Sequence, residues 1–310
     1  MNIDRLKRGL KKIAKNPLQI ILYMDRFCFF PLLSDETYLK ILYRIKLNKR
    51  LNLNNPQTFN EKLQWLKLYN RKPEYTRLAD KYEVKKYVAE IIGEEYIIPC
   101  LGVWDRFEDI DFSALPNQFV LKATHDCGSI CICTDKEHFD INGAKNKLNT
   151  ALKNNYFLEG REWPYKNIKP RIIADQYMVD ESGYELKDYK FFVFNGEMKA
   201  MFIATDRNAV TETCFDFFDR DFRHLPFTNG HPNAAREFRK PDNFDEMIRL
   251  AEKLGKGIPQ IRIDFYNING KIYFGEFTFF HWGGMVPFIP EEWDYTFGSW
   301  IDLPALKTRG

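Results

Sequence analysis

The chain has 310 residues, of which 45% are hydrophobic and 29% are charged. Its 46 lysine and arginine residues nearly balance its 43 acidic residues, which gives a net charge of +3. This composition excludes wholesale disorder, and the near balance of charge argues against a protein built mainly to neutralise a nucleic-acid backbone. We therefore expect no nucleic-acid partner.

The first 34 residues predict a basic amphipathic helix that runs into a hydrophobic stretch. The apolar run from Asn16 to Met24 is shorter than the ~20 residues that a membrane span needs. Two interpretations of residues 1–34 stay open: a helix packed on the protein body, which we favour, and a peripheral contact with a membrane surface. No small-residue cleavage site of a signal peptide follows, so we expect a cytoplasmic protein, with the inner face of the membrane as the alternative.

Several later stretches have the periodicity and the caps of helices. Thr58, followed by Glu61 three residues later, is the expected N-cap of one of them. Gly93 is expected to end the next one. The predicted helices lie at 35–75 (two or three short ones), 78–92, 142–157 and 243–256.

Strands are predicted where the hydrophobic period changes to two. Asn195-Gly196 is the strongest short hairpin signal in the chain, and a second hairpin is expected to turn over residues 267–270. The predicted strands lie at 118–124, 130–134, 171–179, 188–194, 199–205, 214–218, 260–266 and 271–278. A helical front followed by hairpin-connected strands predicts an α+β fold with antiparallel sheets.

Two lysines occupy unusual places in these strands. Lys122 lies near the end of a strand, just before a turn that contains Gly128 and Ser129, where backbone N–H groups and a lysine can hold a phosphate together. Lys190 lies in an otherwise apolar strand and needs either a path to water or an anionic partner. The alternative for both is a solvated lysine of an edge strand.

The second predicted hairpin carries a pair of carboxylates. Asp264 and Glu276 lie on its two strands, and Arg262 and Thr278 each share a face with one of them because they are two residues away. Facing carboxylates are hard oxygen ligands, suited to Mg²⁺ that bridges nucleotide phosphates. The alternative is a charged surface patch, which the apolar neighbours in both strands make less attractive.

Three cysteines, at positions 127, 131 and 133, have the spacing C-x3-C-x-C. A zinc site of the usual kind needs two clustered pairs, so we interpret these cysteines as small hydrophobic residues of a hairpin. His125, near the glycine turn, is either a phosphate contact or a solvated turn residue.

The order of these features resembles the ATP-grasp superfamily, and specifically its TupA-like family from bacterial polysaccharide gene clusters. The resemblance runs from about residue 55 to residue 298. It rests on Asn55-Pro-Gln-Thr-Phe-Asn-Glu-Lys62, Ala79-Asp-Lys-Tyr82, Phe119-Val-Leu-Lys122, Ile173-Ala-Asp-Gln-Tyr177, Asp188-Tyr-Lys190, Asn195-Gly-Glu197, Arg262-Ile-Asp264 and Gly275-Glu-Phe-Thr278 followed by Gly283-Gly284. The resemblance implies an ATP-grasp fold, in which two α/β lobes with antiparallel sheets clamp ATP.

This resemblance also implies a division of the chain and a nucleotide site. The segments would be a basic helical region (1–54), a pre-grasp portion (55–117), a small lobe (118–178) and a large lobe with the metal-binding hairpin (179–310). The residues expected to contact the nucleotide are Lys81, Lys122, Gly128, Ser129, Asp175, Gln176, Tyr177, Met178 and Lys190. Asp175 stands in the hinge, where the family more usually has a glutamate that binds the ribose.

For the reacting end, the resemblance implies Mg²⁺ ligated by Asp264, Glu276 and Thr278, where Thr278 replaces a more common asparagine. Arg262 and Lys190 are the expected catalytic residues, and Arg262 matches the arginine that stabilises charge on an acyl phosphate. His281, beside the glycine pair, is a candidate for lining an acceptor pocket.

The implied activity is an ATP- and Mg²⁺-dependent carboxylate–amine ligase of surface polysaccharide synthesis, joining, for example, a uronic acid to an amino acid or amino sugar. Three alternatives are weighed against it. A nucleotide-sugar glycosyltransferase would use the D-x-D motif Asp219-Arg220-Asp221. The other two are an ATP-dependent phosphotransferase on the same fold and a non-catalytic scaffold.

Overall fold

The computed structural model describes residues 33–180, 186–206 and 212–305. The predicted amphipathic helix of residues 1–34 therefore lies almost wholly outside the described residues. Within these ranges, no helix has both the length and the apolar character needed to cross a membrane.

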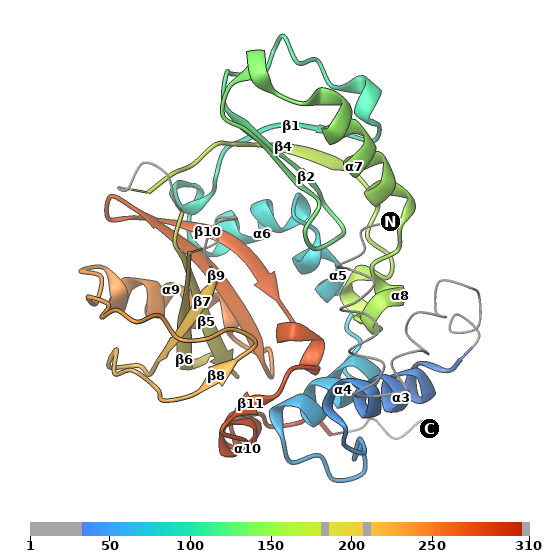
Figure 1. Cartoon of the computed structure of the whole chain (residues 1–310), viewed down its shortest axis with the longest axis vertical. Coiled ribbons are helices and arrows are strands. Elements are labelled where there is room, and N and C mark those ends of the chain that lie inside the picture. Colours follow the sequence, from blue (N-terminus) through green and yellow to red (C-terminus); the bar gives the residue numbers. More distant parts are fainter. Residues whose placement is uncertain (1–32, 181–185, 207–211, 306–310) are drawn as a thin grey trace.

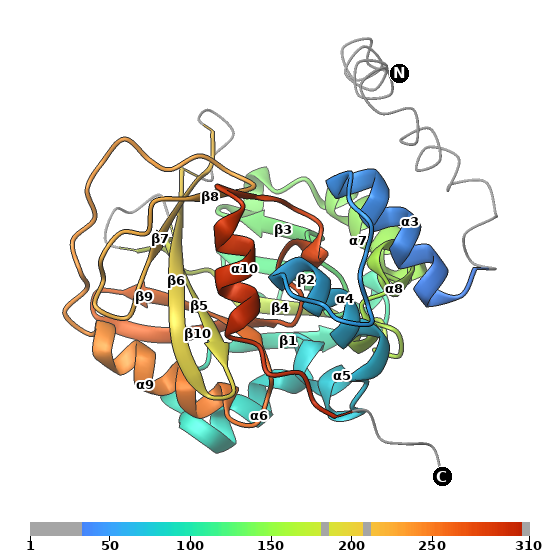
Figure 2. The ribbon, with the colours of Figure 1, turned by 90° about the horizontal axis from the view of Figure 1, so that it is seen from below.

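The described chain begins with helices α3 (Asp35–Leu47) and α4 (Phe59–Tyr69). The predicted capping box of α4 is confirmed, because the Thr58 hydroxyl accepts from the Glu61 N–H and the Glu61 carboxylate accepts from the Thr58 N–H. The late helix α10 (Glu292–Ser299) lies beside α4 (Figure 2). Asp294 of α10 accepts two hydrogen bonds from Asn60, which ties the C-terminal part of the chain to the helical front.

The predicted helix over 78–92 is two helices, α5 (Glu74–Ala79) and α6 (Glu83–Ile92). Asp80 separates them: one carboxylate oxygen accepts the N–H groups of Tyr82 and Glu83, and the other accepts from Arg171. This side-chain cap competes with a continuous helix, and it leaves Lys81 in the turn between α5 and α6.

A four-stranded antiparallel sheet, called the small sheet here, has the strand order β1-β4-β2-β3. Its strands are β1 (Cys100–Trp104), β2 (Phe119–Ala123), β3 (Ile130–Cys133) and β4 (Ile172–Gln176). Helix α7 (Ile141–Lys153) packs on it and shares its separate hydrophobic core (Figure 1). The prediction missed β1, and it carried α7 on to residue 157, although Asn154 is extended and the short helix α8 (Phe157–Gly160) starts anew.

A five-stranded antiparallel sheet, called the large sheet, has the strand order β10-β9-β5-β6-β7. Its strands are β5 (Asp188–Phe194), β6 (Glu197–Thr205), β7 (Cys214–Phe218), β9 (Ile261–Ile268) and β10 (Lys271–Thr278). Helix α9 (Phe244–Gly255) covers one face, and β8 (Thr228–Asn229) pairs with β11 (Phe288–Ile289) in a small separate sheet. Both predicted hairpins are present: Asn195-Gly196 and Asn269-Gly270 each have positive φ at both residues, as the favoured two-residue turns require.

The predicted α+β fold with antiparallel sheets is confirmed. Figure 1 shows the small sheet above the large sheet, and residues of α6 border a cavity between the two. The division into four segments stays a prediction; within it, β1 falls in the 55–117 segment but pairs with β4 of the next one.

Candidate active site

The cavity between the sheets is lined by charged residues from both sheets, from α6 and from the turn before α6. Four of these residues are lysines and four are acids: Lys81, Lys85, Lys122, Asp175, Asp188, Lys190, Asp264 and Glu276. All of them except Lys85 and Asp188 were predicted as site residues from the sequence. The fold therefore brings together residues that are almost 200 positions apart in the chain.

On the small sheet, Asp175 is the centre of a buried ion-pair cluster. Its side chain is 5% exposed, and its two oxygens lie 3.1 Å from Lys122 Nζ and 3.0 Å from Lys85 Nζ. Strands β2 and β4 are neighbours, which places Lys122 beside Asp175. Asp175 thus neutralises and orients two lysines that face the cavity; its predicted role as a ribose ligand stays a prediction.

Three further hinge residues follow Asp175. Gln176 ends β4 and donates its N–H to the carbonyl of Pro99 at 3.0 Å, while Tyr177 and Met178 are half-buried and lie outside regular secondary structure. This segment leads from the small sheet towards β5 of the large sheet. The structure therefore places these residues in a connection between the sheets, and their contact with adenine stays a prediction.

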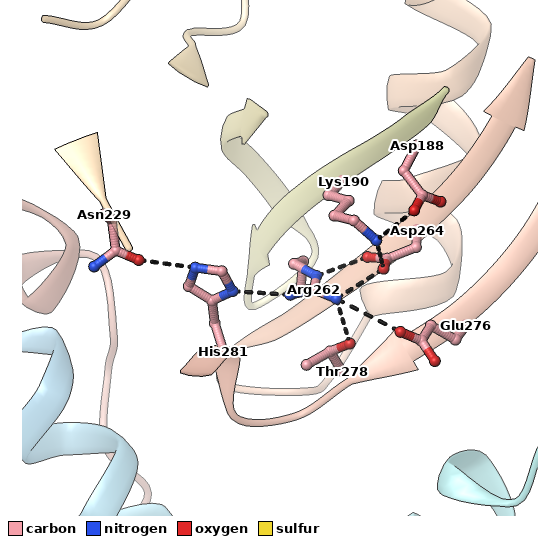
Figure 3. A network of polar contacts seen from close by, with 8 residues as sticks. All are labelled: Asp188, Lys190, Asn229, Arg262, Asp264, Glu276, Thr278 and His281. Carbon is pink, nitrogen blue, oxygen red and sulfur yellow. Dashed lines mark hydrogen bonds and ion pairs between the residues drawn. The ribbon is translucent and has the colours of Figure 1, made fainter. Parts of the chain in front are cut away.

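On the large sheet, Arg262 and Asp264 form a two-fold hydrogen-bonded ion pair (Figure 3). Arg262 Nε lies 2.7 Å from one carboxylate oxygen of Asp264, and Nη2 lies 2.8 Å from the other. Nη2 also donates to the Thr278 hydroxyl at 2.8 Å and lies 3.6 Å from a carboxylate oxygen of Glu276. The predicted sharing of faces is confirmed, because Glu276 stands opposite Asp264 and Thr278 stands opposite Arg262 in the β9–β10 register.

Lys190 has anionic partners, as we expected for a lysine in an otherwise apolar strand. Its ammonium group contacts the carboxylate of Asp264 and lies 3.2 Å from that of Asp188 (Figure 3). Burial by itself would raise the pKa of Asp264, but the charges of Arg262 and Lys190 outweigh it and lower that pKa. Asp264 is therefore held as a carboxylate, as a metal ligand must be.

His281 forms a hydrogen bond that orients Arg262. Its Nδ1 accepts a hydrogen bond from Arg262 Nη1 at 2.8 Å, and its Nε2 donates to Asn229 Oδ1 at 2.9 Å. Burial and the charges of Arg262 and Lys190 depress the pKa of His281 well below its ordinary value, so the ring is neutral and can accept from the guanidinium. Because His281 is 3% exposed, it orients Arg262 rather than lining an acceptor pocket.

The turn between β2 and β3 carries the predicted phosphate-binding loop. Lys81 donates to the carbonyl of Asp126, and the Ser129 hydroxyl donates to the Asp126 carboxylate. Gly128 has a φ of 99°, a conformation that favours glycine. His125 is buried, with Nε2 3.0 Å from the carbonyl of Ala151, so the interpretation as a solvated turn residue is wrong.

The β9–β10 hairpin has the donor chemistry that Mg²⁺ requires. Asp264 and Glu276 are paired across the strands, and a register shift between Phe274 and Glu276 forms an irregularity at Gly275. The Glu276 side chain is 39% exposed, so its oxygens remain open to the cavity. The described residues contain no group of three His, Cys, Asp or Glu side chains that could hold a metal. Mg²⁺ would therefore take its other ligands from Thr278, water or a bound phosphate, as is usual for this ion.

Other candidate motifs do not form sites in the described chain. The cysteines at 127, 131 and 133 are free thiols. The Asp219 carboxylate accepts the backbone N–H groups of Asp221 and Arg223, and Arg223 lies 2.9 Å from the Asp221 carboxylate. The D-x-D motif thus stabilises its own turn after β7.

Sequence reasoning missed Lys85, Asp188 and Asn229. Lys85 had a usable signal, because it lies four residues after Lys81 within the predicted helix 78–92. Asn229 had none, since it lies in a two-residue strand without a recognisable pattern.

A family model described as TupA-like ATPgrasp matches residues 61–302, which include every residue of this charged cavity. The chain belongs to the TupA-like ATP-grasp family. The solved structures that this ATP-grasp protein resembles include D-alanine–D-alanine ligase from Bacillus anthracis in complex with ATP, with 15% identity, a TM-score of 0.38, and coverage of 65% of this chain and 54% of that one. They also include the D-alanine–D-alanine ligase of Helicobacter pylori, with 12% identity, a TM-score of 0.42, and coverage of 78% and 69%. No curated protein matches the sequence significantly.

Another similar structure is N5-carboxyaminoimidazole ribonucleotide synthetase in complex with ADP, with 12% identity, a TM-score of 0.42, and coverage of 80% of this chain and 58% of that one. The chain thus spans between 54% and 69% of the lengths of these three proteins.

Proposed function

We propose that this TupA-like ATP-grasp protein is an ATP- and Mg²⁺-dependent carboxylate–amine ligase. It would phosphorylate a carboxylate with the γ-phosphate of ATP and join the resulting acyl phosphate to an amine, which gives an amide. We further propose a role in bacterial surface polysaccharide synthesis, with a uronic acid and an amino acid or amino sugar as the substrate pair.

The observation that carries this proposal is the charge arrangement around one cavity. Lys122 of the small sheet and Lys85 of α6, both ion-paired to Asp175, line the cavity together with Lys190 and Asp264 of the large sheet, and Arg262 is bonded to Asp264. Lysines suit the phosphates of a nucleotide, whereas a hydrogen-bonded guanidinium suits charge that develops at a reacting carbonyl. Phosphoryl transfer relies on such positioning and charge stabilisation, and it needs no protein nucleophile.

Each group has a separate task in this proposal. Lys122 and Lys190 hold phosphate oxygens, and Asp264 and Glu276 are the residues that would hold Mg²⁺. When bound, the metal ion would neutralise charge on the phosphates. Arg262, fixed by Asp264 and His281, stabilises the anion on the acyl phosphate and on the tetrahedral oxygen formed by amine attack.

The glycosyltransferase alternative finds less support, because the Asp219 and Asp221 carboxylates are engaged within their own turn. A phosphotransferase that uses the same site remains the second candidate. It would yield a stable phosphorylated product instead of an amide, so product analysis separates the two.

The test is a screen of carboxylic acids with ATP, Mg²⁺ and hydroxylamine, which traps an acyl phosphate as a hydroxamate. We expect at least one acid, sought first among uronic acids, to give ADP and hydroxamate in equal amounts, and Glu276→Gln to abolish both. ADP with a stable phosphorylated product and no hydroxamate would support the phosphotransferase. Glycosyl transfer from a nucleotide sugar without ATP would contradict the ligase.

A further inference from the structure

A tryptophan beside the arginine site is exposed to solvent. Trp282 directly follows His281, the residue that orients Arg262, and it is 41% exposed. All six tryptophans of the chain lie in its described part, and Trp282 is the only exposed one. Neither the fold nor the proposed chemistry so far gives this side chain a task.

The backbone conformation of Trp282 is unusual for a residue with a side chain. Its φ of 52° and ψ of 25° lie in the left-handed region, which Gly283 and Gly284 also adopt with φ of 60° and 62°. Glycine enters this region at no steric cost, whereas a tryptophan is strained there. Strained residues persist only where the surrounding structure holds them, and they cluster at functional sites.

Two fully buried side chains of α4 hold this turn in place. Lys67 donates to the carbonyl of Gly283 at 2.7 Å. The Gln64 amide donates to the same carbonyl at 3.0 Å and to that of Gly284 at 2.8 Å. The buried Glu162 is the counter-charge of Lys67: a Cβ atom added at Gly283 would lie 3.3 Å from Glu162 Oε1 and 3.6 Å from Lys67 Nζ. The fold thus commits buried polar groups, which are costly to desolvate, to a turn that presents one exposed indole.

A second segment, Asn229-Gly230-His231, packs against the same turn. Asn229 Oδ1 accepts from the ring of His281 at 2.9 Å (Figure 3). Gly230 has a φ of 85°, and a Cβ atom added there would lie 2.8 Å from Nε1 of Trp282, so the indole lies directly against this glycine. The ring centroids of His231 and Trp282 are 5.7 Å apart. The same two segments therefore hold both the histidine that orients the arginine and the exposed indole.

Phe215 of β7 completes an aromatic platform, defined here as the rings of Phe215, His231 and Trp282. The rings of Phe215 and Trp282 are stacked, with centroids 5.9 Å apart and planes inclined by 21°. The centroid of the His231 ring lies 4.6 Å from that of Phe215. Because Phe215 is buried, it supports the other two rings from the protein side.

The register of the large sheet places this platform close to the charged cavity. Phe215 of β7 pairs with Ala204 of β6, and Ala204 pairs with Asp188 of β5, which lines the cavity. Residues directly opposite each other in neighbouring strands point to the same face of a sheet. Phe215 and Asp188 therefore share a face and are two strand spacings apart, which is roughly 10 Å. One substrate can thus contact both the platform and the reacting groups.

The exposed part of the platform also has hydrogen-bonding groups to offer a ligand. Within the described chain, the indole N–H of Trp282 and the ring nitrogens of His231 have no hydrogen-bond partner. The face of an aromatic ring carries partial negative charge and attracts polarised C–H bonds, and an N–H group donates to a hydroxyl. A pyranose ring combines both features, because its face carries C–H bonds and its rim carries hydroxyls.

We propose that the aromatic platform binds the pyranose ring of a substrate by stacking on Trp282, and that it thereby directs the reacting group of that substrate towards Arg262. This inference rests on the proposed ligase function, and it adds the residue that recognises the sugar ring. It also gives a reason for the strained turn, since a glycine at position 282 would fit the backbone but could not stack on a sugar.

The binding part needs no active enzyme. In ¹⁵N-labelled full-length protein, the indole signal of Trp282 is the one missing from Trp282→Phe. We expect a saturable shift of this signal with methyl glucuronoside or methyl glucosaminide, and none with sorbitol, a polyol without a ring. The sugar that acts identifies whether the acid or the amine substrate carries the ring. A signal that neither sugar moves, that sorbitol moves equally, or that responds only to a planar base such as uridine would overturn the proposal.

The kinetic part compares two variants of Trp282. Trp282→Gly removes the ring and suits the left-handed backbone, so it should fold. We expect KM for the sugar substrate, measured in the hydroxamate assay for an acid or in amide formation for an amine, to rise about tenfold or more, which corresponds to the loss of one stacking contact. KM for ATP should not change. Trp282→Phe keeps a flat ring and should stay within about threefold of the wild type.

Tyr295→Ala, which removes an exposed ring from α10, is the control and should change neither constant. An unchanged KM for the sugar substrate in Trp282→Gly, or an equal rise in KM for ATP, would contradict the assignment. Failure of every acid in the hydroxylamine screen to release ADP would instead count against the ligase function, while the sugar titration still tests the platform.

Discussion

At the scale of single residues, Arg262 has the most contacts that bear on chemistry. It bonds both oxygens of Asp264, the Thr278 hydroxyl and the ring of His281. A guanidinium held on several sides keeps one orientation, which an ammonium on a flexible stem does not. In the proposed ligase reaction, we therefore expect the chemistry to depend on Arg262 more than on Lys122 or Lys190.

Replacing Arg262 by lysine tests this role. We expect Arg262→Lys to keep binding ATP but to lose amide formation by on the order of 10²–10³-fold, the usual effect of removing one stabiliser of a developing anion. Calorimetry with ATP and Mg²⁺, together with steady-state kinetics, measures the two quantities. Arg249→Lys, an exposed change on α9, serves as the control. Normal turnover by Arg262→Lys would mean that the arginine is structural.

The metal-ligand prediction concerns Glu276. Its substitution by glutamine removes one charged ligand, so we expect turnover to be almost lost while the protein stays folded, as circular dichroism would show. A glycosyltransferase would instead need the carboxylates of the D-x-D motif. A ligase does not use them, so we expect Asp221→Asn to keep a turnover close to that of the wild type. The reverse pattern, an active Glu276→Gln and an inactive Asp221→Asn, would refute the ligand assignment.

His281 should give the folded protein a distinct pH dependence. Its pKa in the folded state is depressed, so below its ordinary value near 6.5 the unfolded chain binds more protons than the folded one. Protonation of His281 in the unfolded chain therefore lowers the free energy of unfolding as the pH falls below about 6.5. We expect His281→Gln to flatten the acid-side slope of the unfolding free energy by up to ~1.4 kcal/mol per pH unit. Urea titrations at several pH values measure this slope.

At the residue scale, the charged hairpin was partly predictable and the burial of Glu162 was not. The two-residue period places Arg262 and Asp264 on one face of β9, but Glu276 stands opposite Asp264 only because the register shifts by one residue at Gly275. A regular hairpin closed by Asn269-Gly270 would place Gly275 opposite Asp264, so the pairing of the two carboxylates did not follow from the period alone. Glu162 follows a four-residue helix in an irregular segment, where no period tells which side chains point inward.

At the scale of elements, local signals predicted α4 with its capping box and α9 close to its observed bounds, but they missed a competing side chain at α6. Thr58 and Glu61 form the expected box at α4, but Asp80 divides the predicted helix 78–92 by capping its second half. Strand β1 escaped prediction because five residues, with a central Gly102, carry little periodic pattern. Only its pairing with β4 makes it a strand.

The contact between α4 and α10 depends on the absence of a side chain at Gly298. A Cβ atom there would lie 2.2 Å from the carbonyl oxygen of Gln57, which is backbone and cannot turn away. We expect Gly298→Ala to lower the free energy of unfolding by about 1–3 kcal/mol, as overpacking of a tight contact does. Ser299→Ala, at the exposed neighbouring position, should change it far less. Urea denaturation compares the two, and an unaltered Gly298→Ala protein would show that the helices can separate without cost.

At the scale of the whole molecule, the two sheets have separate hydrophobic cores and meet around charged side chains. The antiparallel fold followed from hairpin signals and from the order of the elements. The ion pair between Lys85 of α6 and Asp175 of β4 could not follow from them, because it depends on how α6, which packs in the core of the large sheet, faces the small sheet. In particular, nothing local to Lys85 reveals that Asp175 lies beside it.

The central claim is that this cavity binds the nucleotide and the metal for ligation. A crystal structure with Mg²⁺ and a non-hydrolysable ATP analogue tests it most directly. We predict phosphates against Lys122 and Lys190, with Mg²⁺ between them and the carboxylates of Asp264 and Glu276. A nucleotide bound elsewhere on the chain, or Mg²⁺ coordinated by Asp219 and Asp221, would contradict the account.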